Sequence, residues 1–170
     1  MKHIFAPLIM SILCVSITPA QSTQASQDSL RGIKSLHVVV EEIPADVASQ
    51  TSVTTQQIQT DVELRLRRSS IIVTTEKPDA ILVVVVNPIP VQQTDGRLVG
   101  IIAFSANIWM EQWIRTEKNP KNVFLAPTWR TSATSYTSTT LFSQMCRDRV
   151  LPDLLDRFIN DYLAANPKTP

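Results

Sequence analysis

The chain has 170 residues, with 16 Lys+Arg against 15 Asp+Glu and a formal net charge of +1 at pH 7. A net charge this close to zero gives no electrostatic signal for nucleic acid or for an anionic membrane surface, both of which attract basic chains. The length is typical of one domain built around one hydrophobic core.

Residues 1–25 form a segment of their own. Lys2 and His3 precede an apolar run over residues 4–17, which is the pattern of a secretory signal peptide. The run has about 14 residues, fewer than the roughly 20 that span a bilayer, so we expect the segment to be cleaved rather than to remain as an anchor. Small residues give two candidate cleavage sites, after Ala20 and after Ala25, and we favour Ala25.

A cleaved signal peptide predicts a periplasmic or secreted protein. Cys14 lies inside the apolar run and follows Leu13, whereas the lipidated cysteine of lipoprotein families follows a small residue, so we expect no lipid anchor. Cleavage leaves Cys146 as the one cysteine, which excludes an intramolecular disulfide. We expect a buried, unreactive thiol there, with an intermolecular disulfide as the alternative.

The remaining chain is predicted to hold a short lead and one domain. Residues 26–31 are mostly polar and predict a flexible lead, and residues 32–170 show no repeat and no shift in composition. Because Lys2 is the one charged residue in 1–25, the rest of the chain carries 15 basic and 15 acidic side chains.

The first predicted strand covers residues 33–43, where Leu36, Val38 and Val40 fall on one face with the period of a half-buried strand. Pro44 ends it. Residues 47–70 contain neither Gly nor Pro, and the spacing of their apolar residues fits both a strand and a helix. Alternating apolar residues over 62–66 would suit a strand, and the spacing of Ile58 and the apolar residues after it would suit a helix.

We interpret residues 47–70 as a helix, because Thr54 or Thr55 can cap its start and its Gln, Glu, Leu and Arg residues are good helix formers. Arg65, Arg67 and Arg68 would then lie in the last turn, where cations meet the negative end of the helix dipole. A phosphate-binding patch is the alternative explanation of the three arginines.

Next, residues 71–75 predict a short strand and 77–79 a turn. The unbroken apolar run over residues 80–86 predicts a central strand covered on both faces. Pro88 and Pro90 are expected to weaken strand pairing beyond it, and Asp95 with Gly96 predicts a two-residue hairpin turn.

Two long strands follow over residues 98–116 and 123–138. In the first strand, Trp109 and Trp113 share the face that carries Ser105, Asn107 and Glu111. Its other face is apolar and carries Ile102, Phe104, Ala106, Ile108, Met110 and Ile114. The second strand is rich in Thr and Ser in its second half, as in a solvated or edge strand.

The tryptophans are the most informative surface candidates. Exposed together, Trp109 and Trp113 would mark a protein interface or an apolar-ligand surface, unless a loop or the lead covers them. Trp129 could join this candidate interaction surface only in one register of the second strand, because a slip of one residue would place it in the core.

A helical segment is predicted over residues 141–164. Its apolar residues recur at helical spacing, and Pro152 together with the polar Asp148 on the same stripe favours a break near Leu151. The spaced apolar residues are Leu151, Leu155, Phe158, Ile159 and Tyr162. The assembled prediction is a single α+β domain of order β-α-β-β-β-β-α, with about five strands in a mainly antiparallel sheet and two helices on one face.

The sequence offers no catalytic constellation. His37 is the one histidine outside the signal segment, no G-x-S-x-G motif occurs, and three glycines are too few for a phosphate-binding loop. One histidine and one cysteine cannot supply a usual zinc site, and Glu41 and Glu42 point to opposite faces of a strand. We therefore predict a non-enzyme without cofactor or metal.

The order of elements resembles small bacterial envelope domains: the amino-terminal domain of the Tol-system propeller protein, curli-secretion-type lipoproteins and penicillin-binding-protein activators. The run Leu64-Arg65-Leu66-Arg67-Arg68 before a short strand is also similar to uncharacterised exported proteins. The resemblance covers about residues 32–167, is architectural and transfers no site residue. It implies a non-catalytic module that docks onto an envelope protein. A carrier of an apolar or amphiphilic ligand is the alternative, and an enzyme of unrecognised type comes third.

Overall fold

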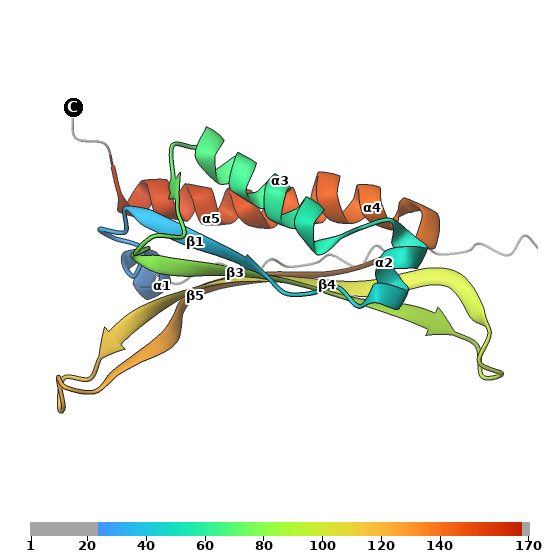
Figure 1. The fold of residues 1–170 in the computed structure, drawn as a ribbon, viewed down its shortest axis with the longest axis horizontal. Coiled ribbons are helices and arrows are strands. Elements are labelled where there is room, and N and C mark those ends of the chain that lie inside the picture. The colour runs from blue at the N-terminus through green and yellow to red at the C-terminus, as the bar shows by residue number, and fades with distance from the viewer. Residues whose placement is uncertain (1–23, 168–170) are drawn as a thin grey trace, which may run out of the picture.

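Helices cover one face of a five-stranded sheet in the computed structural model, which describes residues 24–167 (Figure 1). The strands are β1 (Ser35–Val40), β2 (Ile72–Val73), β3 (Ala80–Gln92), β4 (Leu98–Arg115) and β5 (Val123–Ser138). The helices are α1 (Gln24–Asp28), α2 (Ala45–Thr51), α3 (Thr55–Arg68), α4 (Phe142–Met145) and α5 (Leu151–Ala165), with the 3-10 turn η1 (Thr139–Leu141) and the π-helical turn η2 (Cys146–Val150). The predicted single α+β domain is confirmed.

The sheet has the strand order β2-β1-β3-β4-β5 and mixes both kinds of pairing. β1 runs parallel to β2 and β3, while β3, β4 and β5 form an antiparallel meander. The parallel β1–β2 pair needs a crossover connection, which α2 and α3 provide. The antiparallel pairs join the longest strands, so the sheet is mostly antiparallel, as predicted.

Helix α3 confirms the helical interpretation of residues 47–70 over its second part. Thr54 caps it: the Thr54 hydroxyl accepts a hydrogen bond from the Gln57 N–H (3.2 Å), and the Gln57 side chain accepts one from the Thr54 N–H (3.0 Å). This capping box satisfies backbone donors that the first turn leaves free. Ile58 is fully buried and Leu64 is 45% exposed. The helical stripe requires this arrangement, whereas strand alternation would place Leu64 on the buried face.

Strand β3 continues through Pro88 and Pro90, where the sequence predicted weakened pairing. The two prolines face Phe104 and Ile102 of β4. β1 pairs with β3 only as far as Val84, so beyond that point β3 has a free edge. A proline lacks an N–H but is tolerated where that N–H would point away from a partner strand.

The β3–β4 connection is longer than the predicted two-residue turn. The Gln93 N–H donates to the Arg97 carbonyl (2.8 Å), and Gly96 has a φ of +83° that glycine adopts without strain. The register shifts between Pro90 and Gln92, and Gly100, with a φ of +70°, lies in the extra length of β4 opposite the shift. A glycine with positive φ is typical of such bulges.

The C-terminal segment is helical throughout, but its regular α-helix is interrupted by the π-turn η2 directly before α5, which begins at Leu151. The predicted break near Leu151 is thus a π-turn and not a gap between two helices. The helix widens into the π-turn η2 before α5, and Leu151 keeps helical angles (φ −64°, ψ −44°). A π-turn adds a residue to one helical turn and so shifts the apolar stripe. Asp148 is therefore exposed, and Pro152 lies in the first turn of α5, where its missing N–H costs nothing.

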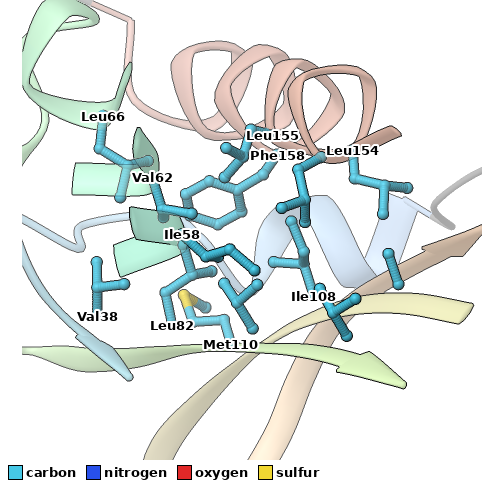
Figure 2. Packing of buried hydrophobic residues seen from close by; sticks show 14 of the residues in the cluster. Val38, Ile58, Val62, Leu66, Leu82, Ile108, Met110, Leu154, Leu155 and Phe158 are labelled. Atoms are coloured by element: carbon cyan, nitrogen blue, oxygen red, sulfur yellow. The ribbon is translucent and has the colours of Figure 1, made fainter. Parts of the chain in front are cut away.

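The core fills the space between the sheet and α3 and α5 (Figure 2). Phe158 of α5 is fully buried and packs edge-on against Trp129, with ring centroids 5.0 Å apart. Burial of this kind is the main favourable term in folding. The residues labelled in Figure 2 are all buried: Val38, Ile58, Val62, Leu66, Leu82, Ile108, Met110, Leu154, Leu155 and Phe158.

Residues 26–31, predicted as a flexible lead, are ordered instead. They form the end of α1 and a turn that buries Leu30 completely. The Ser29 hydroxyl donates to the Thr128 carbonyl of β5 (3.1 Å), and the Gln27 amide donates to Asp161 of α5 (2.7 Å). The flexible lead was predicted from the polar composition of residues 26–31, but the burial of Leu30 and these hydrogen bonds hold the segment against the domain.

The apolar run over residues 4–17, Cys14 and the candidate cleavage site after Ala20 lie outside the described residues.

The two ends of the described chain are joined by hydrogen bonds that we call the clasp. The Asn166 side chain accepts from the Gly32 N–H (2.7 Å) and donates to the Leu30 carbonyl (2.9 Å). The Tyr162 hydroxyl donates to the Ile33 carbonyl (2.7 Å). The segment before β1 is thus fixed to the last turns of α5.

Candidate interaction surface

The sheet face opposite the helices, which we call the open face, carries side chains from three long strands. Its cross-strand neighbours follow from the register, because residues opposite each other share a face. Val39, Val83, Trp109 and Arg130 form one row across β1, β3, β4 and β5. In the next row, Asn107 lies between Val85 and Ser132.

Trp109 lies near the middle of this face and is only half-buried. Its indole N–H donates to the Glu111 carboxylate (3.0 Å) two residues along the same strand. Val83 beside it is 7% exposed although no helix within residues 24–167 covers this face. The indole ring and the neighbouring strands shield that small side chain.

Trp113 lies on the same side of β4 as Trp109 but in different surroundings. It is 65% exposed, because β3 pairs with β4 only up to the Ile81–Glu111 pair and β4 continues beyond it with β5 alone. The alternation of β4 therefore places both tryptophans on one face, and the end of β3 separates a shielded indole from an exposed one.

Trp129 is not part of the predicted interaction surface. The β4–β5 register shifts between Met110 and Glu111, so that Trp129 faces Met110 and Thr128 is the extra residue of β5. Trp129 thus points to the helix side, where it is 2% exposed. Its indole N–H donates to Asp161 of α5 (2.9 Å), which satisfies the polar atom of a buried indole.

The sequence analysis missed exposed apolar side chains at both ends of the long meander. At the β3–β4 end, Ile89, Leu98 and Ile101 are 64%, 52% and 42% exposed. At the β4–β5 end, Val123 and Phe124 are 47% and 43% exposed. The sequence signal that could have found them is length. Two strands of 18 and 16 residues are longer than helices of 14 and 15 residues can cover.

The arginine cluster at the end of α3 is engaged in ion pairs. Arg65 binds Asp156 of α5 through two nitrogens (2.9 and 2.6 Å), and Arg67 lies 2.8 Å from Glu63 one turn earlier. Arg147 of η2 also contacts α3, through Asp61 (2.6 Å). The Arg65 and Arg147 pairs fix α3 to the C-terminal helical segment, and ion pairs engage two of the three arginines, Arg65 and Arg67, that the phosphate-patch alternative would need.

Groups able to do chemistry are dispersed over residues 24–167. His37 lies on the open face opposite Ile81, and within these residues no group of three or more His, Cys, Asp and Glu side chains is placed to hold a metal ion. Cys146 is fully buried, and burial raises the pKa of its thiol to about 12. The expected burial of this cysteine is confirmed, and a protonated thiol is a poor nucleophile.

Comparison with known proteins gives the fold but no family. No family model matches the chain, and no curated protein matches it. A hypothetical protein from Chlamydia trachomatis is similar in structure, with a TM-score of 0.50 and 7% identity over 78% of this chain and 99% of that chain.

Two further structures are similar at lower scores. PelC from Paraburkholderia phytofirmans gives a TM-score of 0.44 and 12% identity over 75% of this chain and 86% of that chain. A minor lipoprotein from Acinetobacter baumannii gives 0.35 and 11% over 78% of this chain and 93% of that chain. Among the described residues, no helix has the length and apolar character needed to cross a membrane.

Proposed function

We propose that this protein is a non-catalytic binding module of the bacterial envelope whose open face contacts a partner protein. The observation that supports the proposal is the row of Val39, Val83, Trp109 and Arg130 across the sheet. The helices α3 and α5 lie on the opposite face of the sheet (Figure 1). Val39, Trp109 and Arg130 of this row are at least partly exposed, so among the described residues these three side chains are accessible to a second molecule.

The composition of this row suits a protein partner. Aromatic residues and arginine are enriched at protein interfaces, where a few of them carry most of the binding energy. Trp109 is already oriented by its hydrogen bond to Glu111, so little side-chain freedom is lost on binding. Ser132 and Asn107 in the next row would supply the polar rim that surrounds such a centre.

A carrier of an amphiphilic ligand is the second candidate, and the packing restricts where the ligand could bind. The space between the sheet and the helices is filled by the core (Figure 2). A carrier would therefore hold its ligand on the open face as well. Extraction of the purified protein with organic solvent would then release a stoichiometric lipid, whereas a protein-binding module would release none.

Site-specific photo-crosslinking in the envelope tests the protein-binding proposal. A benzoylphenylalanine at Ser132, exposed on the open face, should crosslink to one defined protein. The same group at Asn160, exposed on α5, should not. Arg130→Glu should abolish the crosslink, and Arg149→Glu, the matched charge reversal on the helix side, should leave it intact. Equal crosslinks at Ser132 and Asn160, or a crosslink that tolerates Arg130→Glu, would contradict the proposal.

A further inference from the structure

The end of the β4–β5 hairpin, residues 113–125, is a two-stranded ribbon that projects past the rest of the sheet. β3 no longer pairs with β4 beyond Glu111, and the pairs Trp113–Leu125 and Arg115–Val123 join β4 to β5 alone. Figure 1 shows this ribbon, in yellow and orange, extending away from the helical layer. We call these residues the hairpin end.

Both faces of the hairpin end are apolar. Trp113 and Leu125 lie opposite each other on one face, and Ile114 and Phe124 lie opposite each other on the other. Trp113 is 65% exposed and Phe124 43%. A ribbon with one apolar face can bury that face against its own domain. A ribbon with two apolar faces leaves one of them in water, at a free-energy cost of about 25 cal/mol per Å² of apolar surface. Exposed apolar patches of this kind mark protein or membrane interaction sites.

The hairpin end also concentrates positive charge in a chain that is neutral overall. Arg115, Lys118 and Lys121 surround the turn, against the single carboxylate of Glu117. All four side chains are exposed, and within residues 24–167 none of the three cations forms an ion pair. Cations beside tryptophan and other apolar side chains are characteristic of segments at a membrane surface, where they attract anionic headgroups.

The opposite end of the meander lacks this combination. Leu98 and Ile89 are exposed there too, but the cation of that loop, Arg97, is paired with Asp95 at 2.8 Å. The two hairpins therefore differ in free charge while both expose apolar side chains. This makes the β3–β4 hairpin an internal control for the β4–β5 hairpin.

We propose that the hairpin end docks onto a lipid bilayer with anionic headgroups, placing its apolar side chains among the lipids and its cations at the headgroups. A bilayer surrounds a narrow ribbon on both sides, which suits two apolar faces better than one flat protein surface does. The paired part of the ribbon beyond β3, from Trp113 to Arg115, is about 10 Å long at about 3.3 Å per residue, comparable to the depth of interfacial insertion. The hairpin end is separate from the row of Val39, Val83, Trp109 and Arg130 on which the proposed function rests.

Vesicle co-sedimentation with the purified protein tests the proposal. We expect binding to vesicles of phosphatidylcholine mixed with phosphatidylglycerol, much weaker binding to phosphatidylcholine alone, and a loss of binding at high salt. Lys118→Glu with Lys121→Glu should weaken binding by about tenfold or more, and Phe124→Ser should weaken it by about tenfold. On vesicles, tryptophan emission should shift to the blue, and the shift should disappear in Trp113→Phe.

The matched controls lie on the other hairpin. Leu98→Ser and Arg97→Glu should leave vesicle binding unchanged, and all these variants should keep the circular dichroism spectrum of the parent because the altered side chains are exposed. Absence of binding to anionic vesicles, equal binding to neutral vesicles, or equal loss in both sets of variants would overturn the proposal. Self-association through the hairpin end, seen by sedimentation velocity without lipid, would overturn it too. None of these results affects the crosslinking test of the open face.

Discussion

Asp79 shows how one side chain joins two parts of the sheet. Its carboxylate accepts hydrogen bonds from the backbone N–H groups of Lys34 (2.8 Å) and Ser35 (3.0 Å), and so fixes the residue before β3 to the start of β1. The Lys34 N–H is the main cause of a pKa below the ordinary value of 3.8. Burial opposes this shift, and the Ser35 N–H, the Ser35 hydroxyl and the charge of Lys34 reinforce it.

This lowered pKa predicts a pH-dependent contribution to stability. The carboxylate stabilises the fold when ionised, so its contribution is complete above the unfolded-state pKa and is lost as the pH falls through the lower folded-state pKa. Asp79→Asn should therefore lower Tm at pH 7, and the difference from the parent should shrink below about pH 4. Thermal melts followed by circular dichroism from pH 7 to pH 2 measure this, and a difference that stays constant with pH would contradict it.

The tryptophans show, residue by residue, where the sequence was sufficient. Alternation along one strand placed Trp109 and Trp113 on the same face of β4, because that relation depends only on the period of a strand. Placing Trp129 required the β4–β5 register, which depends on the extra residue Thr128 and on contacts with α5. Register is a property of two strands, and the pattern of either strand alone does not determine it.

At the scale of elements, features set by the local sequence were predicted well, and features that depend on a neighbouring element were not. α3 is specified by its own capping box and apolar stripe, and the predicted range 123–138 matches β5 (Val123–Ser138). The passage of β3 through Pro88 and Pro90 depends on where its neighbour β1 ends. The π-turn η2 likewise reflects how the helix packs on the sheet, since it keeps Asp148 exposed while Cys146 is buried.

The packing between α5 and the sheet predicts which aromatic residues maintain the fold. Phe158 contacts the rings of Trp129 and Tyr162 at centroid distances of 5.0 and 6.1 Å and is fully buried. Phe158→Ala should lower the free energy of unfolding by about 3–5 kcal/mol. Trp113→Ala, which removes an exposed aromatic residue, should change it by less than about 0.5 kcal/mol. Urea titrations of both variants compare them, and similar losses would show that the indole of Trp113 packs in the fold.

For the whole molecule, the two proposed surfaces follow from a mismatch in size between the layers. α3 and α5 cover the middle of one sheet face, which leaves the open face and the projecting hairpins in contact with solvent (Figure 1). Net charge, an average over the chain, indicated no attraction to an anionic surface. The fold gathers the cations Arg115, Lys118 and Lys121 at one hairpin against the single carboxylate of Glu117, a local excess that the net charge of the chain does not reveal.

The clasp makes the N-terminal segment dependent on the last turns of α5. Asn166→Ala removes three side-chain hydrogen bonds, two with the N-terminal segment at Gly32 and Leu30 and one with the Tyr162 carbonyl, each contributing about 0.5–1.5 kcal/mol. We expect faster tryptic cleavage after Arg31, which is exposed, with little change in cleavage of the core. Asn160→Ala, an exposed change on the same helix, should leave the rate unchanged. An unaltered rate in Asn166→Ala would mean that the burial of Leu30 alone holds the segment.

The clasp also has a consequence for the order in which the chain acquires its structure. The β3–β4 and β4–β5 hairpins join neighbours in the sequence, and such local contacts can form early in folding. Leu30, Gly32 and Ile33 are separated from their partners Tyr162 and Asn166 by 129 to 136 residues, so the clasp closes a loop of nearly the whole described chain. We therefore expect the segment ahead of β1 to be secured late in folding, after the hairpins have formed.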